Sequence, residues 1–149
     1  MSYLSVISLE DAKTYLGVDD TSRDAEISRF IKSALSYLEK VTNVHVIAKD
    51  KTYQYDSTDC VYVYDYPINS TTNTTATAEI KTLYSIYTES DSSIDSITLN
   101  IGYTNFVEID PDWIECGYVL IECLYEGGKL AALPDLIKIM ISTLKRFVV

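Results

Sequence analysis

The first part of the chain places its apolar residues with the period of a helix. A helix is predicted from Ser8, whose side chain can cap the first amide groups, to Gly17, which suits the left-handed residue that often follows a helix. A second helix, predicted to end at Asn43, is the clearest element of the sequence. Its apolar stripe keeps the i, i+3, i+4, i+7 spacing through Ile27, Phe30, Ile31, Ala34, Leu35, Leu38 and Val41. Residues 1–48 are therefore predicted to form a helical hairpin with one buried face.

From about residue 49 the pattern changes to the period of two that is typical of β-strands. Every second residue of the segment 97–103 is apolar and the others are small or polar, as in a strand buried on one face. Strands are also predicted at residues 53–55, 60–66, 80–87 and 118–125, the last being the most apolar. Polar tracts at residues 69–75, 91–93 and 110–112 are predicted as an exposed loop and two turns. The connections are too short for crossover helices, so the pattern indicates about five antiparallel strands.

The last predicted element is a helix that follows Pro134, because proline and then Asp135 suit the first turn of a helix. Its apolar residues cover more than one face, and a helix of that kind needs cover on most sides. One small domain does not offer enough cover, which indicates a partner protein or a homo-oligomer. The residues predicted for this interface are Ile137, Met140, Ile141, Leu144, Lys145, Arg146 and Phe147.

These elements predict an α+β fold in one domain of 149 residues. The domain would consist of the helical hairpin 1–48, a β-rich acidic insertion 49–128, and a C-terminal segment 129–149 whose helix packs with the hairpin.

The formal net charge of −10 is unevenly distributed. Residues 49–128 hold fourteen acidic and three basic side chains, whereas residues 129–149 hold four basic and one acidic. The chain lacks a basic stripe that would neutralise phosphates, so tight binding of nucleic acid is not expected. An acidic surface would instead let DNA slide past without sticking. The candidates for such a surface are Asp56, Asp59 and Asp65; the alternative is that the charge lies on an outer wall and keeps the protein soluble.

Tyrosine is unusually common, with thirteen residues in the chain. Eight of them lie between residues 53 and 103. Tyrosine is favoured on the faces of β-strands and is also enriched at protein interfaces. The two interpretations are compatible, and both remain open.

The candidates for catalysis and metal binding are few. His45 is the single histidine, and the sequence specifies neither a nucleophile nor a carboxylate beside it. Cys116 and Cys123 are seven residues apart, which is not the spacing of zinc ligands. The acidic residues Asp110, Asp112 and Glu115 do not match a calcium loop and are interpreted as solvated turn residues. Glycine-rich phosphate loops and nucleophile elbows are absent, so neither an enzyme, nor a cofactor, nor a metal site is predicted.

The surroundings of the protein can also be predicted. The first residues lack the basic start and the apolar stretch of a signal peptide, and no apolar run reaches the ~18 residues that span a bilayer. The three cysteines are therefore expected to be buried thiols in a reducing cytoplasm, without a membrane partner.

The order of the elements resembles the phage head–tail connector family, whose members are also called adaptor or head-completion proteins. Residues 7–19, ISLEDAKTYLGVD, are similar to its opening helix and acidic turn, typically Leu-Glu-Glu-Ala-Lys-x-x-Leu. Residues 39–43, EKVTN, resemble a Glu-x-x-Thr-Gly phrase with asparagine in place of glycine. Residues 120–128 resemble the final strand and its Tyr-x-Gly-Gly turn, and residues 133–138, LPDLIK, resemble the Leu-Pro-x-x-Ile-Lys entry to the last helix.

The resemblance implies a structural protein of the virion neck, found in the host cytoplasm during assembly. It implies a homo-oligomeric ring, usually dodecameric, that sits on the portal protein, extends the DNA channel and receives the tail or another neck protein. DNA would pass through the ring without specific binding, and the terminal helix would contact the portal or other copies. The alternative hypothesis is a tail-side or capsid-decorating β-module that binds a receptor or a glycan through its tyrosine-rich surface.

Overall fold

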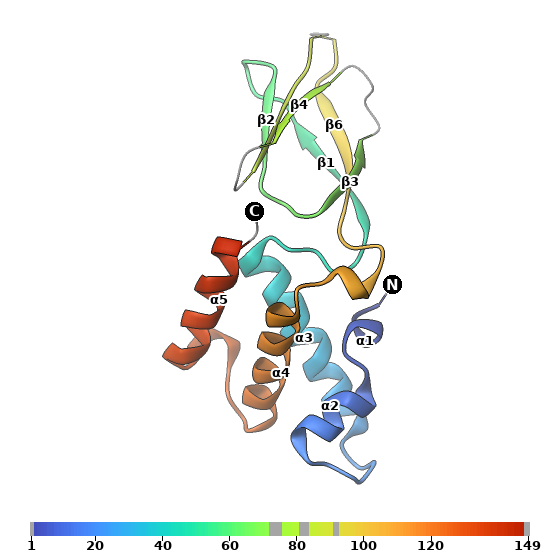
Figure 1. Ribbon diagram of the computed structural model, residues 1–149, viewed down its shortest axis with the longest axis vertical. Helices are drawn as coiled ribbons and strands as arrows, with labels where there is room; N and C mark the ends of the chain where they lie inside the picture. The colour runs from blue at the N-terminus through green and yellow to red at the C-terminus, as the bar shows by residue number, and fades with distance from the viewer. Residues whose placement is uncertain (1, 72–75, 81–83, 91–92, 148–149) are drawn as a thin grey trace.

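Helices gather at one end of the molecule and β-strands at the other (Figure 1). The computed structural model describes residues 2–71, 76–80, 84–90 and 93–147. The helices are α1 (Tyr3–Val6), α2 (Leu9–Leu16), α3 (Asp24–Thr42), α4 (Pro111–Tyr125) and α5 (Asp135–Phe147), with short 3₁₀ turns η1 (Phe106–Glu108) and η2 (Leu130–Ala132). The strands are β1 (Lys49–Gln54), β2 (Cys60–Val63), β3 (Ile68–Thr71), β4 (Thr77–Ile80), β5 (Ser85–Thr88) and β6 (Ser96–Ile101). We call the two ends the helical body and the β body, and together they confirm the predicted α+β fold.

The N-terminal hairpin forms where the sequence predicts it. The Ser8 hydroxyl accepts a hydrogen bond from the Asp11 amide at the start of α2, and Gly17 ends that helix in the left-handed conformation. Asn43 ends α3 in the same conformation with φ 58°. Leu35 and Leu38 are fully buried, as predicted, whereas Phe30 is only half-buried at the edge of the core.

The prediction of a strand at residues 118–125 is wrong, because this segment is the second half of α4. Asp110 caps the helix by accepting a hydrogen bond from the Asp112 amide, and Pro111 occupies the first turn. The predicted turn at residues 110–112 is thus a helix start, and the predicted β-rich segment ends at Ile101 rather than at residue 128. The buried residues of α4 keep the spacing of a helix stripe: Trp113, Cys116, Gly117, Leu120 and Ile121.

The β body consists of two antiparallel three-stranded sheets with the orders β1-β6-β3 and β2-β5-β4. Their inward side chains share one small core, formed by Val61, Val63, Tyr87, Ile97, Leu99 and Ile101. The alternation predicted for residues 97–103 is confirmed, since β6 buries every second residue. The segment predicted as one strand, 80–87, contributes to β4 and β5, with residues 81–83 outside the described part. The predicted loop 69–75 begins within β3, and its residues 72–75 lie outside the description, as do residues 91–92 of the predicted turn 91–93.

The two bodies are joined by backbone hydrogen bonds between three segments. Val44 and Tyr66 form an isolated parallel bridge, in which the His45 amide donates to the Tyr66 carbonyl and the Tyr66 amide donates to the Asn43 carbonyl. On the returning segment, the Gly102 amide donates to the Pro67 carbonyl at 2.8 Å and the Tyr103 amide donates to the His45 carbonyl at 2.9 Å. We call this region the joint. Its short bonds hold the segment entering the β body against the segment that leaves it.

Candidate functional site: exposed faces and the joint

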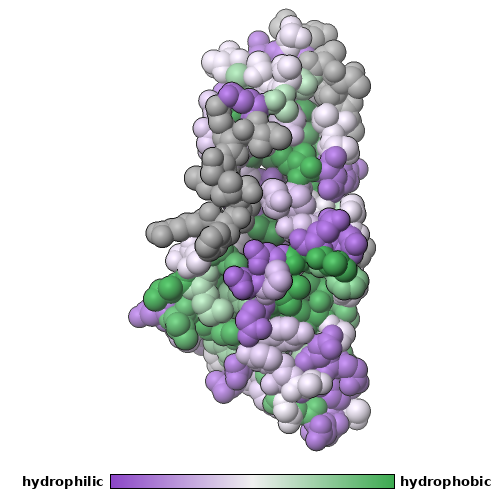
Figure 2. All heavy atoms as spheres, in the orientation of Figure 1, coloured by the Kyte–Doolittle hydropathy of each residue, from purple (hydrophilic) through white to green (hydrophobic). Residues whose placement is uncertain are grey.

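Two large apolar residues of α5 are exposed on its outer side, and neither is among the predicted ones. Ile137, Ile141 and Leu144 pack into the core of the helical body, so the stripe predicted to meet a partner is largely covered by the chain itself. The residues that widen the stripe point outward instead: Leu136 is 69% exposed and Ile139 is 61% exposed. Figure 2 shows the apolar side chains gathered over this edge of the molecule.

The other residues predicted for the α5 interface are Met140, Lys145, Arg146 and Phe147. Met140 is half-buried beside the exposed pair. Lys145, Arg146 and Phe147 continue the backbone of α5, and their side chains lie outside the description.

The three predicted acidic candidates do not form one surface. Asp56 and Asp59 are exposed in the turn before β2, where the Asp56 carboxylate accepts hydrogen bonds from the amides of Thr58 and Cys60. The carboxylate of Asp65 is only 9% exposed. The placement of Asp65 on a free acidic surface is therefore wrong, because its oxygens are bound inside the joint.

The acidic segment 49–128 is also divided between the two bodies. Residues 49–103 hold eight acidic and three basic side chains. The remaining six acidic residues lie between residues 108 and 126, in η1, in α4 and beside them, where the chain has no basic residue. The densest run of negative charge therefore lies at residues 108–126, in η1, in α4 and beside them.

Three tyrosines form a cluster on the outside of the sheet β2-β5-β4. Tyr62 and Tyr64 are 50% and 54% exposed, and the ring of Tyr84 lies 5.7 and 5.5 Å from theirs, measured between ring centroids. Other tyrosines, such as Tyr53 and Tyr87, face inward and pack in or against the β core. The strand-face interpretation thus holds for Tyr53 and Tyr87, whereas the exposed Tyr62 and Tyr64 stay candidates for a contact surface.

A buried ion network crosses the joint and centres on His45. Its Nε2 atom lies 2.5 Å from Asp65 Oδ1, and its Nδ1 atom lies 3.9 Å from Glu39 Oε2. Glu39 comes from the last turn of α3 and Asp65 follows β2, so the histidine stands between one carboxylate of each body. The sequence pattern specifies no partner for His45; Glu39 and Asp65 come beside it only through the fold.

Each carboxylate has further donors. Glu39 accepts hydrogen bonds from the Tyr3 hydroxyl at 2.8 Å and from the Val46 amide at 2.8 Å. Asp65 accepts from the Lys51 ammonium group at 2.7 Å and from the Tyr53 hydroxyl. Residues from α1, α3, β1 and both connecting segments therefore meet in one network.

The protonation states follow from these contacts. Burial by itself would lower the pKa of His45, but the hydrogen bond to Asp65 and the carboxylate of Glu39 outweigh it, so the pKa is raised despite the charge of Lys49. Burial would likewise raise the pKa of Asp65, yet its bonds to His45, Lys51 and Tyr53 hold it well below its usual range. Burial and the bond to Glu39 raise the pKa of Tyr3 to about 12. Nε2 of His45 bonds Asp65, whereas Nδ1 is buried without a hydrogen bond, 3.9 Å from the Glu39 carboxylate; a negative charge near each nitrogen favours the imidazolium.

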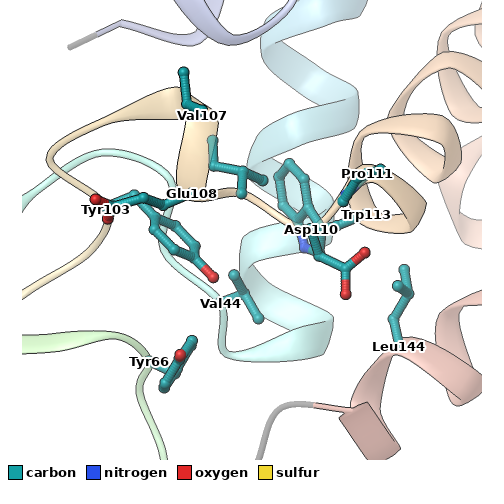
Figure 3. A pocket seen from close by; sticks show the side chains of 10 residues that line it. Val44, Tyr66, Tyr103, Val107, Glu108, Asp110, Pro111, Trp113 and Leu144 are labelled. Carbon is teal, nitrogen blue, oxygen red and sulfur yellow. The ribbon is translucent and has the colours of Figure 1, made fainter.

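A pocket of about 390 Å³ lies beside this network, where the joint meets the ends of α3 and α5 and the start of α4 (Figure 3). Its walls include the rings of Tyr66, Tyr103 and Trp113. The rings of Tyr66 and Tyr103 meet edge to face at 6.1 Å between centroids. Burial, together with the nearby carboxylates of Asp110 and Glu108 and the Tyr66 hydroxyl, raises the pKa of Tyr103 to about 12.

In the part of the chain that the structure describes, no group of three or more histidine, cysteine, aspartate or glutamate residues could hold a metal ion. None of the helices in that part has both the length and the apolar character needed to cross a bilayer. The three cysteines are free thiols, but of the three predicted to be buried only Cys116 is, and burial raises its pKa to about 11.

Solved structures with the same fold were found by comparison. One is titled "Virion of native gene transfer agent (GTA) particle", with a TM-score of 0.73 and 12% sequence identity over 95% of this chain and 90% of that chain. Another is titled "Neck of empty GTA particle computed with C6 symmetry", with a TM-score of 0.70 and 11% identity over the same shares. No curated protein matches the chain.

A protein family also matches the sequence directly. The family is described as phage gp6-like head–tail connector protein, and its match covers residues 6–100, which include the helical hairpin and nearly all of the β body. This match confirms the resemblance to the head–tail connector family and covers the motifs at residues 7–19 and 39–43, whereas those at 120–128 and 133–138 lie beyond it. Since it spans more than half of the 149 residues, the chain belongs to the phage gp6-like head–tail connector family.

Proposed function

We propose that this protein is a structural component of the virion neck and forms a ring, most simply a dodecamer, on the portal protein. The ring extends the DNA channel of the filled head and receives the tail or another neck protein. The protein assembles from the host cytoplasm into the virion. The observation that carries this proposal is the family match over residues 6–100, and the fold shared with gene transfer agent virion and neck structures supports it.

The outer face of α5 supplies the contact between copies or with the portal in this proposal. Leu136 and Ile139 are exposed apolar residues of that helix, and burying them would gain roughly 1.5–3 kcal/mol each. We expect the wild-type protein to form closed rings, alone or with the portal protein of the same genome. The double variant Leu136→Asp/Ile139→Asp is expected to stay folded and to lose the ring. Light scattering gives the mass, electron microscopy the ring, and circular dichroism the fold.

Two controls make this test specific. The variant Ala25→Asp/Ser33→Asp adds the same charge to exposed positions of α3 and is expected to form rings. Ile141→Asp places a charge in the core of the helical body, so it should unfold the protein rather than only dissociate it. If the wild-type protein stays monomeric with the portal present, the proposed ring is wrong. If the double variant still assembles, the outer face of α5 is not the contact.

We propose that the exposed residues Asp56 and Asp59 form part of an acidic surface along which DNA slides without binding. A ring repeats Asp56 and Asp59 in every copy, and such a band repels phosphate groups. Asp56→Lys/Asp59→Lys is expected to slow DNA ejection from assembled particles, most strongly at low salt. Ejection kinetics at two salt concentrations test this. Unchanged kinetics in particles that carry the variant would place these acids on an outer wall.

The cluster of Tyr62, Tyr64 and Tyr84 is the observation that favours a second candidate function, receptor or glycan binding. Aromatic faces of this kind can stack on sugar rings. Saturable binding on a glycan array by a protein that forms no ring would favour this candidate. Ring formation without glycan binding would favour the neck protein.

A further inference from the structure

The pocket at the joint combines aromatic walls with negative charge. Tyr66 from the β2–β3 connection, Tyr103 from the segment after β6 and Trp113 from α4 line it; Tyr66 is 39% exposed, whereas Tyr103 and Trp113 are buried. Glu108 and Asp110 also line the pocket, and Figure 3 shows the Tyr103 hydroxyl directed into it, toward Val44. An apolar ligand would leave both carboxylates without a counter-charge, so the lining favours a cation.

No described basic side chain in the lining neutralises the carboxylates of Glu108 and Asp110. Among the residues whose side chains the structure describes, those that line the pocket include no lysine, arginine or histidine. Neither Glu108 nor Asp110 takes part in an ion pair with another side chain of the described segments. Aromatic faces attract cations, and carboxylates form charge-assisted hydrogen bonds with ammonium and guanidinium groups. The volume of about 390 Å³ accommodates one long basic side chain.

We propose that this pocket binds an arginine or lysine side chain presented by a neighbouring protein of the neck. The identity of the partner rests on the proposed function, whereas the binding of a basic side chain rests only on the lining. The pocket lies where the helical body meets the β body, so an inserted side chain would contact both at once. A partner anchored there would also fix the β body relative to the helices.

The single tryptophan provides a direct measurement. Trp113 lines the pocket, and its indole N–H gives one assignable signal in a ¹⁵N–¹H spectrum of the full chain. The probe is the blocked peptide acetyl-Gly-Arg-Gly-amide, and the matched control peptide carries citrulline, which has the shape of arginine without its charge. We expect a saturable shift of the indole signal with the arginine peptide only. Equal shifts with both peptides would reject recognition of the cation.

Matched variants test the lining. Glu108→Gln/Asp110→Asn removes both charges but keeps a helix cap, because asparagine caps as well as aspartate. We expect it to weaken binding by about fivefold or more. Asp112→Asn/Glu115→Gln removes two charges from the same helix outside the pocket and should bind like the wild type. The proposed site is wrong if Glu108→Gln/Asp110→Asn binds the arginine peptide as well as the wild type does. It is also wrong if Asp112→Asn/Glu115→Gln weakens binding equally.

Two further outcomes would assign the pocket to another occupant. If removing Lys145 and Arg146 (Lys145→Gln/Arg146→Gln) strengthens peptide binding about fivefold or more, the end of the chain's own α5 fills the pocket, and the proposed partner is wrong. If Glu108→Gln/Asp110→Asn abolishes ring formation by the isolated protein, the occupant is a second copy, and the proposed partner is again wrong. The peptide titration needs no ring, so it can succeed even where the proposed ring fails.

Discussion

Replacing Gly102 by alanine is expected to lower the free energy of unfolding by about 3 kcal/mol or more. Gly102 has φ +105°, a conformation that residues with a side chain rarely adopt. An added β-carbon would lie 2.5 Å from the carbonyl oxygen of Ile47 and 2.8 Å from its carbonyl carbon. These atoms belong to the backbone of the joint, so they cannot rotate away, and the segments entering and leaving the β body would have to separate.

A urea titration followed by circular dichroism measures this loss. The matched control is Gly17→Ala, which has φ +66° but no atom within 4 Å of the new β-carbon. It should cost only the strain of the positive φ, about 1 kcal/mol. Equal losses in the two variants would mean that the close approach of Gly102 to the Ile47 backbone does not limit stability.

The helical hairpin could be predicted from sequence because its signals are local. Ser8, Gly17 and Asn43 mark helix ends through their own backbone chemistry, and the stripe through Leu35 and Leu38 repeats over several turns. The strand β6 was equally clear, because one of its faces is buried and the other is not. Elements of this kind need no information about distant residues.

The segment 118–125 shows where local reasoning fails. A short, continuous apolar run is compatible with a buried strand and with a buried helix, and length must decide between them. The deciding signal lay upstream, where Asp110 and Pro111 form a capped helix start that was interpreted as a turn. With that start in place, the buried residues from Trp113 to Ile121 fall on one helical stripe.

The ion network could be anticipated only in part. Val61 and Val63 are buried and Asp65 is next in the same alternation, so a period of two places its carboxylate inward. The partner on α3 depends on how the two bodies pack, because Glu39 and Asp65 are 26 residues apart in the sequence. The pocket was missed for the same reason, since its walls come from four separate segments.

The largest electrostatic effect is expected from Asp65→Asn, which should destabilise the protein by about 2–4 kcal/mol near pH 6. Asparagine keeps the size of the side chain and one acceptor oxygen for Tyr53, but it removes the charge. The imidazolium of His45 then loses its nearest counter-charge while it remains buried. We place the loss somewhat below the range for fully buried pairs because the Lys51 end of the network is partly exposed.

The same network predicts a pH dependence with a definite sign. The raised pKa of His45 adds stability that is fully present below its ordinary value of 6.5 and is lost as the pH rises through the raised value. The lowered pKa values of Asp65 and Glu39 add stability that is present above their ordinary values of 3.8 and 4.5 and is lost as the pH falls through the lowered values. The contribution of the network should therefore be greatest between about pH 5 and 6.5.

Urea titrations of the wild type and of Asp65→Asn at intervals from about pH 5 to pH 9 test this dependence. The wild type is expected to lose stability as the pH rises above 6.5, whereas the variant should show a flatter profile, because His45 has lost the bond that raises its pKa most. Asp19→Asn removes an equal charge from an exposed position and should stay within about 0.5 kcal/mol of the wild type, with the wild-type profile. Parallel profiles for Asp65→Asn and the wild type would show that the imidazolium does not join the two bodies. A wild-type profile that rises above pH 6.5 would mean that His45 is buried in its neutral form.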